Sequence, residues 1–338
     1  MAKSAYNKNM SLKNIKKMLI YTYWSRKGGA MEYQLKINEM LNELTSSFMG
    51  TVLKDELLKN HTYFKIGGPA SILTVPENTE DLKCVLKLIK KYQIDYFVIG
   101  NGTNLLISDE GYKGIIVKIG DKFNKIERNG NKVTVGAGVL LSSLAKYLAK
   151  EELAGFEFAS GIPGYLGGAV PMNAGAYGGE MKDVIRKVKC MDVDGNIHEF
   201  TNEEMEFAYR RTKISDSQHI VLEADLQLSQ GREEDIMAII RELNEKRTSK
   251  QPLNLPSAGS TFKRPQNGYA SKLIEDAGLK GLKYKGAMVS DKHSGFIVSY
   301  DNACCEDVLE LMRIVISNVY DKFGIKLEPE IKIIGTRL

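Results

Sequence analysis

The sequence predicts an α+β protein of two or three domains. Strand-like and helix-like stretches mix irregularly along the chain, unlike the regular alternation that builds a parallel α/β sheet. The length of 338 residues is about twice the roughly 150 residues of an average domain. Apolar residues make up 43% and charged residues 26%, which are ordinary values for a folded protein. These values exclude a disordered chain, a collagen and a disulfide-stapled miniprotein.

The first half of the chain predicts a mixed helix-and-sheet region that becomes strand-rich. Residues 32–60 predict a helix followed by a polar segment that leads to the first strand. Apolar residues at helical spacing predict an amphipathic helix over Glu80–Tyr92. The other expected elements are a helix at Leu141–Lys150 and strands at Ile72–Val75, Tyr96–Ile99, Gly114–Ile119 and Val133–Val135.

The second half predicts further strands, a charged helix, a linker and a last α+β region. The linker is residues 251–256, because its two prolines lack N–H donors for a helix or a sheet. We expect the final strand, Glu330–Ile334, to return to the first domain. The remaining elements are strands at Val184–Val193, Ile197–Phe200, Ile220–Leu228 and residues 295–299, and helices at residues 233–248, 270–277 and 305–323.

The positive charge of the chain is concentrated in residues 1–30. This segment carries seven Lys and Arg residues and no acid, so a net charge of +5 leaves about −2 for the rest. We therefore expect no nucleic-acid partner for the folded body. The segment predicts either a disordered tail or a misassigned start, with Met31 as the initiator. No apolar run reaches the roughly 18–20 residues of a membrane span, so no membrane partner is expected.

Cysteine and histidine residues show no framework or metal-binding spacing. Cys84, Cys190, Cys304 and Cys305 predict a reduced, cytoplasmic protein. The four histidines are scattered, and neither HExxH nor CxxC occurs, so no metal site is expected. The sequence does not determine the oligomeric state, and a monomer is compatible with it.

Two glycine-rich segments carry the strongest chemical signals. Residues 100–104, Gly-Asn-Gly-Thr-Asn, follow a buried strand, and consecutive amides in such a turn suit a pyrophosphate. The same five residues also fit an ordinary glycine turn, and they lack the third glycine of a Rossmann fingerprint. Residues 161–179 hold seven glycines and almost no charge. That segment predicts either close backbone approach to a large flat ligand or a tightly packed structural crossover.

Three isolated polar residues are candidates for catalysis. Ser260 follows a glycine and precedes two cations, so it can exchange a proton, although a turn-capping serine fits equally. Arg210 and Glu330 also fit solvated surface charges. No spacing argument connects the three residues.

Taken together, seven segments in a fixed order resemble the UDP-N-acetylenolpyruvoylglucosamine reductase family, bacterial flavoenzymes of peptidoglycan precursor synthesis. The resemblance extends from Thr62 to Gly335 and fits the branch that lacks an extra tyrosine-bearing loop. The chain departs from the family's usual residues at Tyr165, Ser299 and Asp301. The matching segments are residues 63–68, 100–104, 161–164, 172–178, 209–210, 256–262 and 328–330.

The resemblance implies a fold of two FAD-binding α+β subdomains and a C-terminal α+β substrate-binding domain. The implied division is residues 31–120 with the strand 327–336, residues 121–230, and residues 231–326 with the linker helix. It also implies noncovalent FAD reduced by NADPH, with reduction of the enolpyruvyl double bond of UDP-N-acetylglucosamine enolpyruvate to UDP-N-acetylmuramate. The alternative is another flavin oxidase or dehydrogenase of the same fold acting on a sugar or alcohol.

The resemblance also implies roles for particular residues. Ser260 protonates the substrate carbon, while Arg210 and a protonated Glu330 assist the enolate-like intermediate. The residues implied in cofactor binding are Tyr63, Gly100, Asn101, Gly102, Thr103, Asn104, Gly161, Ile162, Pro163, Gly164, Gly168, Asn173, Gly175, Ala176 and Arg247.

Overall fold

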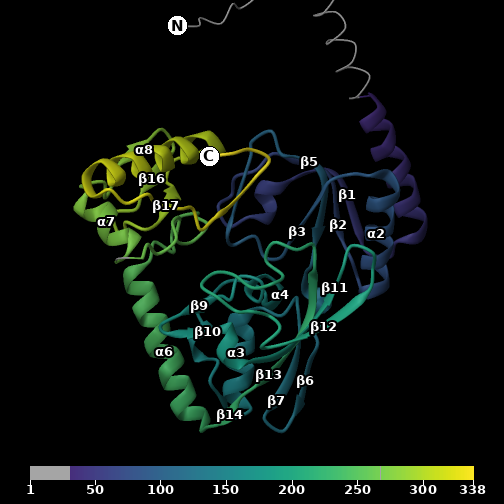
Figure 1. Ribbon diagram of the computed structural model, residues 1–338, viewed down its shortest axis with the longest axis horizontal. Helices are drawn as coiled ribbons and strands as arrows, with labels where there is room; N and C mark the ends of the chain where they lie inside the picture. The colour runs from purple at the N-terminus through teal and green to yellow at the C-terminus, as the bar shows by residue number, and fades with distance from the viewer. Residues whose placement is uncertain (1–30, 267) are drawn as a thin grey trace, which may run out of the picture. The chain divides into compact units, whose positions relative to one another are not determined.

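The computed structural model describes residues 31–266 and 268–338 (Figure 1). The predicted tail, residues 1–30, lies outside the described residues. The chain divides into two compact units, one ending at Ser47 and the other spanning Phe48–Leu338. In the first unit residues 31–47 are helical. This confirms the helix that the sequence predicts at the start of residues 32–60.

The second unit begins with a four-stranded sheet in the order β1-β2-β5-β3. Strand β1 (Thr51–Leu57) is antiparallel to β2 (Pro69–Val75), whereas β5 (Tyr112–Lys118) is parallel to both β2 and β3 (Tyr96–Ile99). Helix α2 (Thr79–Tyr92) joins β2 to β3. It starts where the Asn78 side chain accepts two backbone N–H bonds and ends where Gln93 turns left-handed (φ 53°).

A second, five-stranded antiparallel sheet follows, in the order β12-β11-β13-β7-β6. Helix α3 (Leu141–Lys150) and the one-turn helix α4 (Leu166–Ala169) lie between β7 and β11 in the chain. The glycine-rich segment begins just before α4 and ends at the short strand β10 (Gly179–Glu180). The sheet strands are β6 (Ile126–Asn129), β7 (Lys132–Gly136), β11 (Ile185–Met191), β12 (Ile197–Thr201) and β13 (Ile220–Gln227).

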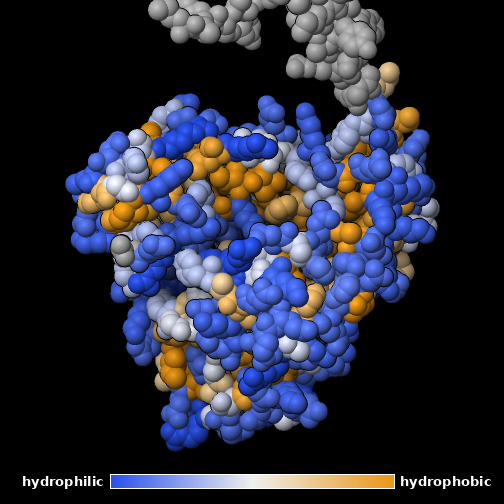
Figure 2. All heavy atoms as spheres, viewed as in Figure 1, coloured by the Kyte–Doolittle hydropathy of each residue, from blue (hydrophilic) through white to orange (hydrophobic). Residues whose placement is uncertain are grey.

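The charged helix α6 (Glu233–Lys250) leads from this sheet to a C-terminal layer (Figure 1). In that layer α8 (Cys305–Phe323) packs against α7 (Ala270–Asp276) and against a small antiparallel sheet in the order β15-β16-β17. The face in Figure 2 is mostly hydrophilic, with apolar residues gathered along the lower edge of the α8 layer. The strands are β15 (Lys283–Tyr284), β16 (Ala287–Val289) and β17 (Ile297–Ser299).

The end of the chain returns to the first sheet region, as the sequence predicts. Strand β18 (Lys332–Ile334) pairs in parallel with β4 (Leu105–Ile107), which directly follows the Gly100–Asn104 turn. Ile334 packs into the apolar core of the first sheet. Two sheets followed by a C-terminal layer of helices and short strands confirm the predicted α+β class.

Candidate active site

A cavity of about 1190 Å³ lies among the glycine-rich segments, α6 and the C-terminal layer. We call it the central cavity. Small-molecule pockets typically measure about 300–1,000 Å³, so it has room for a large ligand. The predicted site residues that line it are Tyr63, Gly100, Asn101, Gly102, Thr103, Asn104, Gly161, Ile162, Pro163, Gly164, Gly168, Gly175, Ala176, Arg210, Arg247, Ser260 and Glu330.

The Gly100–Asn104 turn presents unpaired backbone amides. Gly102 needs a glycine because its φ is +66° and a Cβ would lie 2.0 Å from the carbonyl oxygen of His61. The Tyr63 amide donates to the Gly102 carbonyl at 3.0 Å, and this bond holds the turn in place. Within the described chain, the N–H groups of residues 101–104 donate to no other group. The turn therefore has the donors that a phosphate-bearing ligand requires.

The glycines of the 161–179 segment serve two different purposes. A Cβ on Gly167 would lie 2.8 Å from the Cβ of Ala137, so this glycine permits close packing of the chain. A Cβ on Gly168 would meet nothing within 4 Å, and Gly168 lines the central cavity. The Asn101 side chain donates to the Pro163 carbonyl at 2.6 Å, which joins this segment to the Gly100–Asn104 turn.

Asn173 is the one predicted cofactor residue that does not line the cavity. It is buried, with Nδ2 donating to Glu180 Oε2 (2.5 Å) and to the Ala208 carbonyl (3.1 Å). Its Oδ1 accepts from the Lys182 amide at 3.0 Å. These bonds hold the segment in shape, so the side chain of Asn173 acts on the structure of the loop.

Tyr165, a departure from the family pattern, directly precedes α4 and lines the cavity. Its Cδ2 would lie 3.6 Å from a Cβ on Gly100, so the ring lies beside the turn. Burial raises the pKa of the Tyr165 hydroxyl, with a further contribution from Asp121.

Arg210 and Glu330 form an ion pair although they are 120 residues apart. Arg210 Nε donates to Glu330 Oε1 at 2.8 Å, and the side chains are 22% and 13% exposed. Glu330 lies just before β18, and Asn104 Nδ2 donates to its carbonyl at 3.2 Å. Arg210 itself has a left-handed backbone (φ 54°), a strained conformation for this residue type.

Ser260 lies next to this ion pair through the backbone. The Glu330 amide donates to the Thr261 carbonyl at 2.8 Å, so the segment that carries Ser260 runs beside Glu330. Ser260 is exposed in the cavity lining and follows Gly259, whose φ is +80°. The fold thus brings Arg210, Ser260 and Glu330 to the wall of one cavity.

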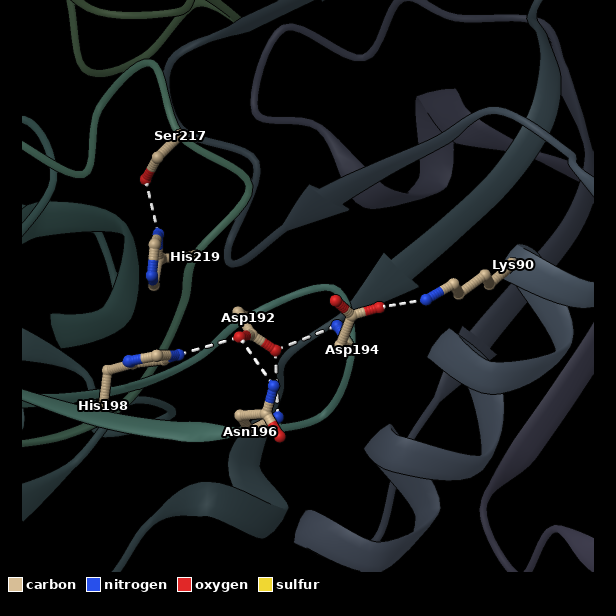
Figure 3. Close-up of polar contacts among 7 residues, drawn as sticks. All are labelled: Lys90, Asp192, Asp194, Asn196, His198, Ser217 and His219. Carbon is tan, nitrogen blue, oxygen red and sulfur yellow. Dashed lines mark hydrogen bonds and ion pairs between the residues drawn. The ribbon is translucent and has the colours of Figure 1, made fainter.

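The sequence analysis missed a set of polar contacts among His, Ser and Asp residues (Figure 3). Ser217 and His219 line the cavity, and His219 Nδ1 lies 2.8 Å from Ser217 Oγ. The His219 ring meets the His198 ring edge-on at 5.3 Å, and His198 Nε2 bonds Asp192 Oδ2 at 2.7 Å. The bond from His198 holds the pKa of Asp192 below its usual range, and burial lowers the pKa of His219. His198 and His219 come together only in the folded chain, so their spacing in the sequence did not indicate this contact.

In the part of the chain that the structure describes, no group of three or more His, Cys, Asp or Glu could hold a metal ion. None of the helices described there is long and apolar enough to cross a membrane.

The comparisons with known proteins agree with this geometry. A sequence model of an FAD binding domain matches residues 70–201. Fold and site together therefore define an FAD-binding oxidoreductase. A second model, of the C-terminal domain of UDP-N-acetylenolpyruvoylglucosamine reductase, matches residues 251–334.

Individual relatives make the family specific. The chain is 52% identical over 281 residues to the UDP-N-acetylenolpyruvoylglucosamine reductase of Clostridioides difficile (strain 630), covering 83% of this chain and 92% of the relative. It is 51% identical to the UDP-N-acetylenolpyruvoylglucosamine reductase of Alkaliphilus oremlandii, covering 84% of this chain and 93% of that relative. The crystal structure of the Thermus caldophilus reductase (MurB) superimposes with a TM-score of 0.72 at 35% identity, covering 84% and 98%. The chain belongs to the UDP-N-acetylenolpyruvoylglucosamine reductase family, which confirms the predicted resemblance.

Proposed function

We propose that this protein is an NADPH-dependent flavoenzyme that reduces the enolpyruvyl double bond of UDP-N-acetylglucosamine enolpyruvate, giving UDP-N-acetylmuramate. The observation that carries the proposal is that Arg210, Glu330 and Ser260 meet at a cavity also lined by the open glycine turn. A sugar or alcohol oxidase would have no evident use for these three groups together.

The cavity has groups suited to FAD. The free amides of residues 101–104 suit its diphosphate, and the open side of Gly168 permits a flat ring system to approach the backbone. When bound, FAD supplies the electron pair that adds to the distal carbon of the substrate double bond. The protein's residues then have two tasks, which are to stabilise negative charge and to deliver a proton.

Arg210 is the group that stabilises charge in this proposal. Reduction of an enol ether conjugated to a carboxylate pushes charge onto that carboxylate. A fixed guanidinium stabilises the developing charge more than water does, because it is already oriented. Arg210 uses Nε for Glu330, which leaves the donors on its terminal nitrogens for the substrate.

The resemblance implies that Glu330 is a protonated carboxyl that donates a hydrogen bond. Its Oε1 accepts from Arg210 Nε at 2.8 Å, so Glu330 also orients Arg210. The donor role uses the other carboxyl oxygen, Oε2, because a protonated carboxyl can accept at one oxygen and donate from the other.

Ser260 delivers the proton to the carbon that bears the ether oxygen. Its position after Gly259 leaves the hydroxyl exposed to the cavity. The adjoining Thr261 is held by bonds to Gly295 and Glu330, so the serine projects from a fixed backbone. General acid catalysis of this kind contributes about 10²–10⁴-fold to a rate.

Separate half-reactions test the proposal. In Ser260→Ala we expect anaerobic bleaching of the flavin by NADPH at the normal rate, and recolouring by the enolpyruvyl substrate slowed about 100-fold or more. Ser249→Ala, an exposed serine on α6, is the matched control. Equal loss in both half-reactions would contradict the assignment of Ser260. Recolouring of the wild-type protein by oxygen but not by substrate would favour the oxidase alternative.

A further inference from the structure

Three side chains beside the Gly100–Asn104 turn are joined by hydrogen bonds that the proposed function does not use. His61 Nε2 lies 2.9 Å from Glu56 Oε1, and His61 Nδ1 lies 3.2 Å from Lys118 Nζ. Glu56 belongs to β1, His61 ends the short helix η1 (Leu58–His61), and Lys118 ends β5. All three residues are half-buried, and none of them lines the central cavity.

The directions of these two hydrogen bonds follow from the donors that each group has. An ammonium group can only donate, so Lys118 donates to His61 Nδ1, which therefore carries no hydrogen. The ring hydrogen is on Nε2, which donates to the carboxylate of Glu56. The three side chains thus form a row of a cation, a neutral ring and an anion.

This row contacts the segment of the turn from two sides. A Cβ on Gly102 would lie 2.0 Å from the carbonyl oxygen of His61, so the His61 backbone packs directly against the turn. Lys118 pairs with Ile99, the residue that directly precedes the turn. The charge of Lys118 is therefore held next to the segment that carries the open amides.

The turn has N–H donors, but no basic residue belongs to it. A diphosphate brings negative charge, which a nearby cation stabilises further. Lys146 and Lys332 line the cavity, but both are exposed, so water and salt screen their charges. Lys118 is half-buried, so its charge is screened less.

His61 explains why Lys118 stays in this position. A lysine side chain ordinarily extends its ammonium group into water. Burial lowers the pKa of Lys118, whereas the negative charges of Asp121 and Glu56 act in the opposite direction. The ring nitrogen of His61 gives the half-buried ammonium an acceptor, and Glu56 orients the ring so that this nitrogen faces Lys118.

We propose that Lys118 is a cation that strengthens diphosphate binding at the Gly100–Asn104 turn from outside the cavity lining, with His61 as its positioning residue. The inference rests on the proposed binding of the FAD diphosphate at this turn. ADP carries the same adenosine diphosphate group as FAD, and riboflavin carries no phosphate, so these two compounds separate the parts of the ligand.

The first experiment measures the dissociation constants of FAD, ADP and riboflavin for flavin-free protein. In Lys118→Met we expect FAD and ADP to bind about tenfold more weakly, with riboflavin unchanged, because only the diphosphate loses a favourable charge. Lys118→Arg should recover most of the affinity, because it keeps the charge. Lys113→Met, at an exposed lysine of the same strand, is the matched control and should bind all three compounds normally.

The second experiment tests the positioning role of His61. His61→Leu removes both ring contacts, whereas His61→Asn keeps an oxygen acceptor near the position of Nδ1. We expect ADP affinity to fall about tenfold in His61→Leu and much less in His61→Asn. Combining His61→Leu with Lys118→Met should cause no loss beyond that of Lys118→Met, because both residues act through one charge. Additive losses would contradict the positioning role.

The wild-type protein alone supplies a third test. Because its pKa is lowered, Lys118 loses its charge at a lower pH than an exposed lysine does. ADP affinity should therefore fall as the pH rises from about 7.5 to about 10.4, the ordinary lysine value, and Lys118→Met should show no such fall. The charged and titratable groups around Lys118 are Glu56, His61 and Asp121, and carboxylates and imidazoles keep the same charge across this alkaline range.

The outcomes separate this inference from the proposed function. Protein that binds no FAD would overturn both. Normal FAD and ADP affinity in Lys118→Met, or an equal loss of riboflavin affinity, would overturn the role of Lys118 alone. If Lys118→Met does not fold, the alkaline profile of the wild-type protein decides, and an ADP affinity that stays constant across it would overturn the inference.

Discussion

The two arginines of the central cavity differ in what surrounds them. Arg210 has a carboxylate of its own, Glu330, at 2.8 Å. Arg247 has no acidic partner in the described protein, and its side chain lies across Gly161. Both residues line the same cavity.

This difference indicates which charge is available in the free protein. The charge of Arg210 is already balanced by Glu330. In the function that we propose, the substrate carboxylate therefore meets an oriented but neutralised pair. Such a pair binds the ground state weakly and responds to the charge that builds up during reaction, which is where stabilisation accelerates a rate. Arg247 lacks that balance, so its part of the cavity suits a ligand that stays bound through the turnover.

The largest effect is expected from removing Arg210, the arginine that is paired with Glu330. In Arg210→Met we expect kcat/KM for the enolpyruvyl substrate to fall about 10²–10³-fold, the usual cost of losing one oriented donor. FAD affinity should stay unchanged, and steady-state kinetics with flavin titration measures both. Arg211→Met, in an exposed pair with Asp216, is the neighbouring control. A large loss of FAD affinity in Arg210→Met would contradict the view that Arg210 acts on the substrate and Arg247 on the cofactor.

A smaller effect is expected from displacing the unpaired arginine without deleting it. In Gly161→Ala the new Cβ lies 2.9 Å from Arg247 Cδ, so the side chain must move. Overpacking of this kind costs about 1–3 kcal/mol, and we expect FAD affinity to fall about tenfold or more. Gly120→Ala, where the nearest atom is 3.7 Å away, is the control for a glycine substitution. Normal FAD affinity in Gly161→Ala would mean that the position of Arg247 is unimportant.

The smallest effect is expected at Asp192, a carboxylate that is paired with His198 and does not line the cavity. The bond from His198 depresses the pKa of Asp192, so this carboxylate stabilises the fold above its unfolded pKa of about 3.9. That contribution is lost as the pH falls through the lower, folded pKa. Asp192→Asn should lower Tm at neutral pH by at most about 2–4 °C. The difference should shrink at acid pH in thermal scans, and a constant difference across pH would contradict this account.

The sequence predicted the regular elements best where apolar residues recur at helical spacing. The helices at 141–150 and 305–323 coincide with α3 and α8. The strand at 96–99 coincides with β3, although its residues show no alternation of burial. Strand β1 was missed because it forms an edge of the sheet with mostly exposed or half-buried residues, so no alternation marks it. Strand β4 has three consecutive buried residues, too short a run to separate from the glycine turn before it.

The candidate site was predictable only through the family resemblance. Arg210 and Glu330 each looked like surface charges, because the contact between them depends on the parallel pairing of β18 with β4. Glu56, His61 and Lys118 could not be found from sequence at all. What singles them out is the contact between side chains of three different elements, and that contact exists only once the chain is folded.

The pairing of β18 with β4 also makes two distant segments move as one. Asn104 donates to the Glu330 carbonyl and accepts from the Lys332 amide, so the glycine turn and Glu330 are joined through one short strand pair. A substitution that loosens this strand pair therefore displaces the open amides of the turn and the partner of Arg210 together. The place where a phosphate can bind and the orientation of a guanidinium 120 residues away in the chain are in this sense one mechanical unit.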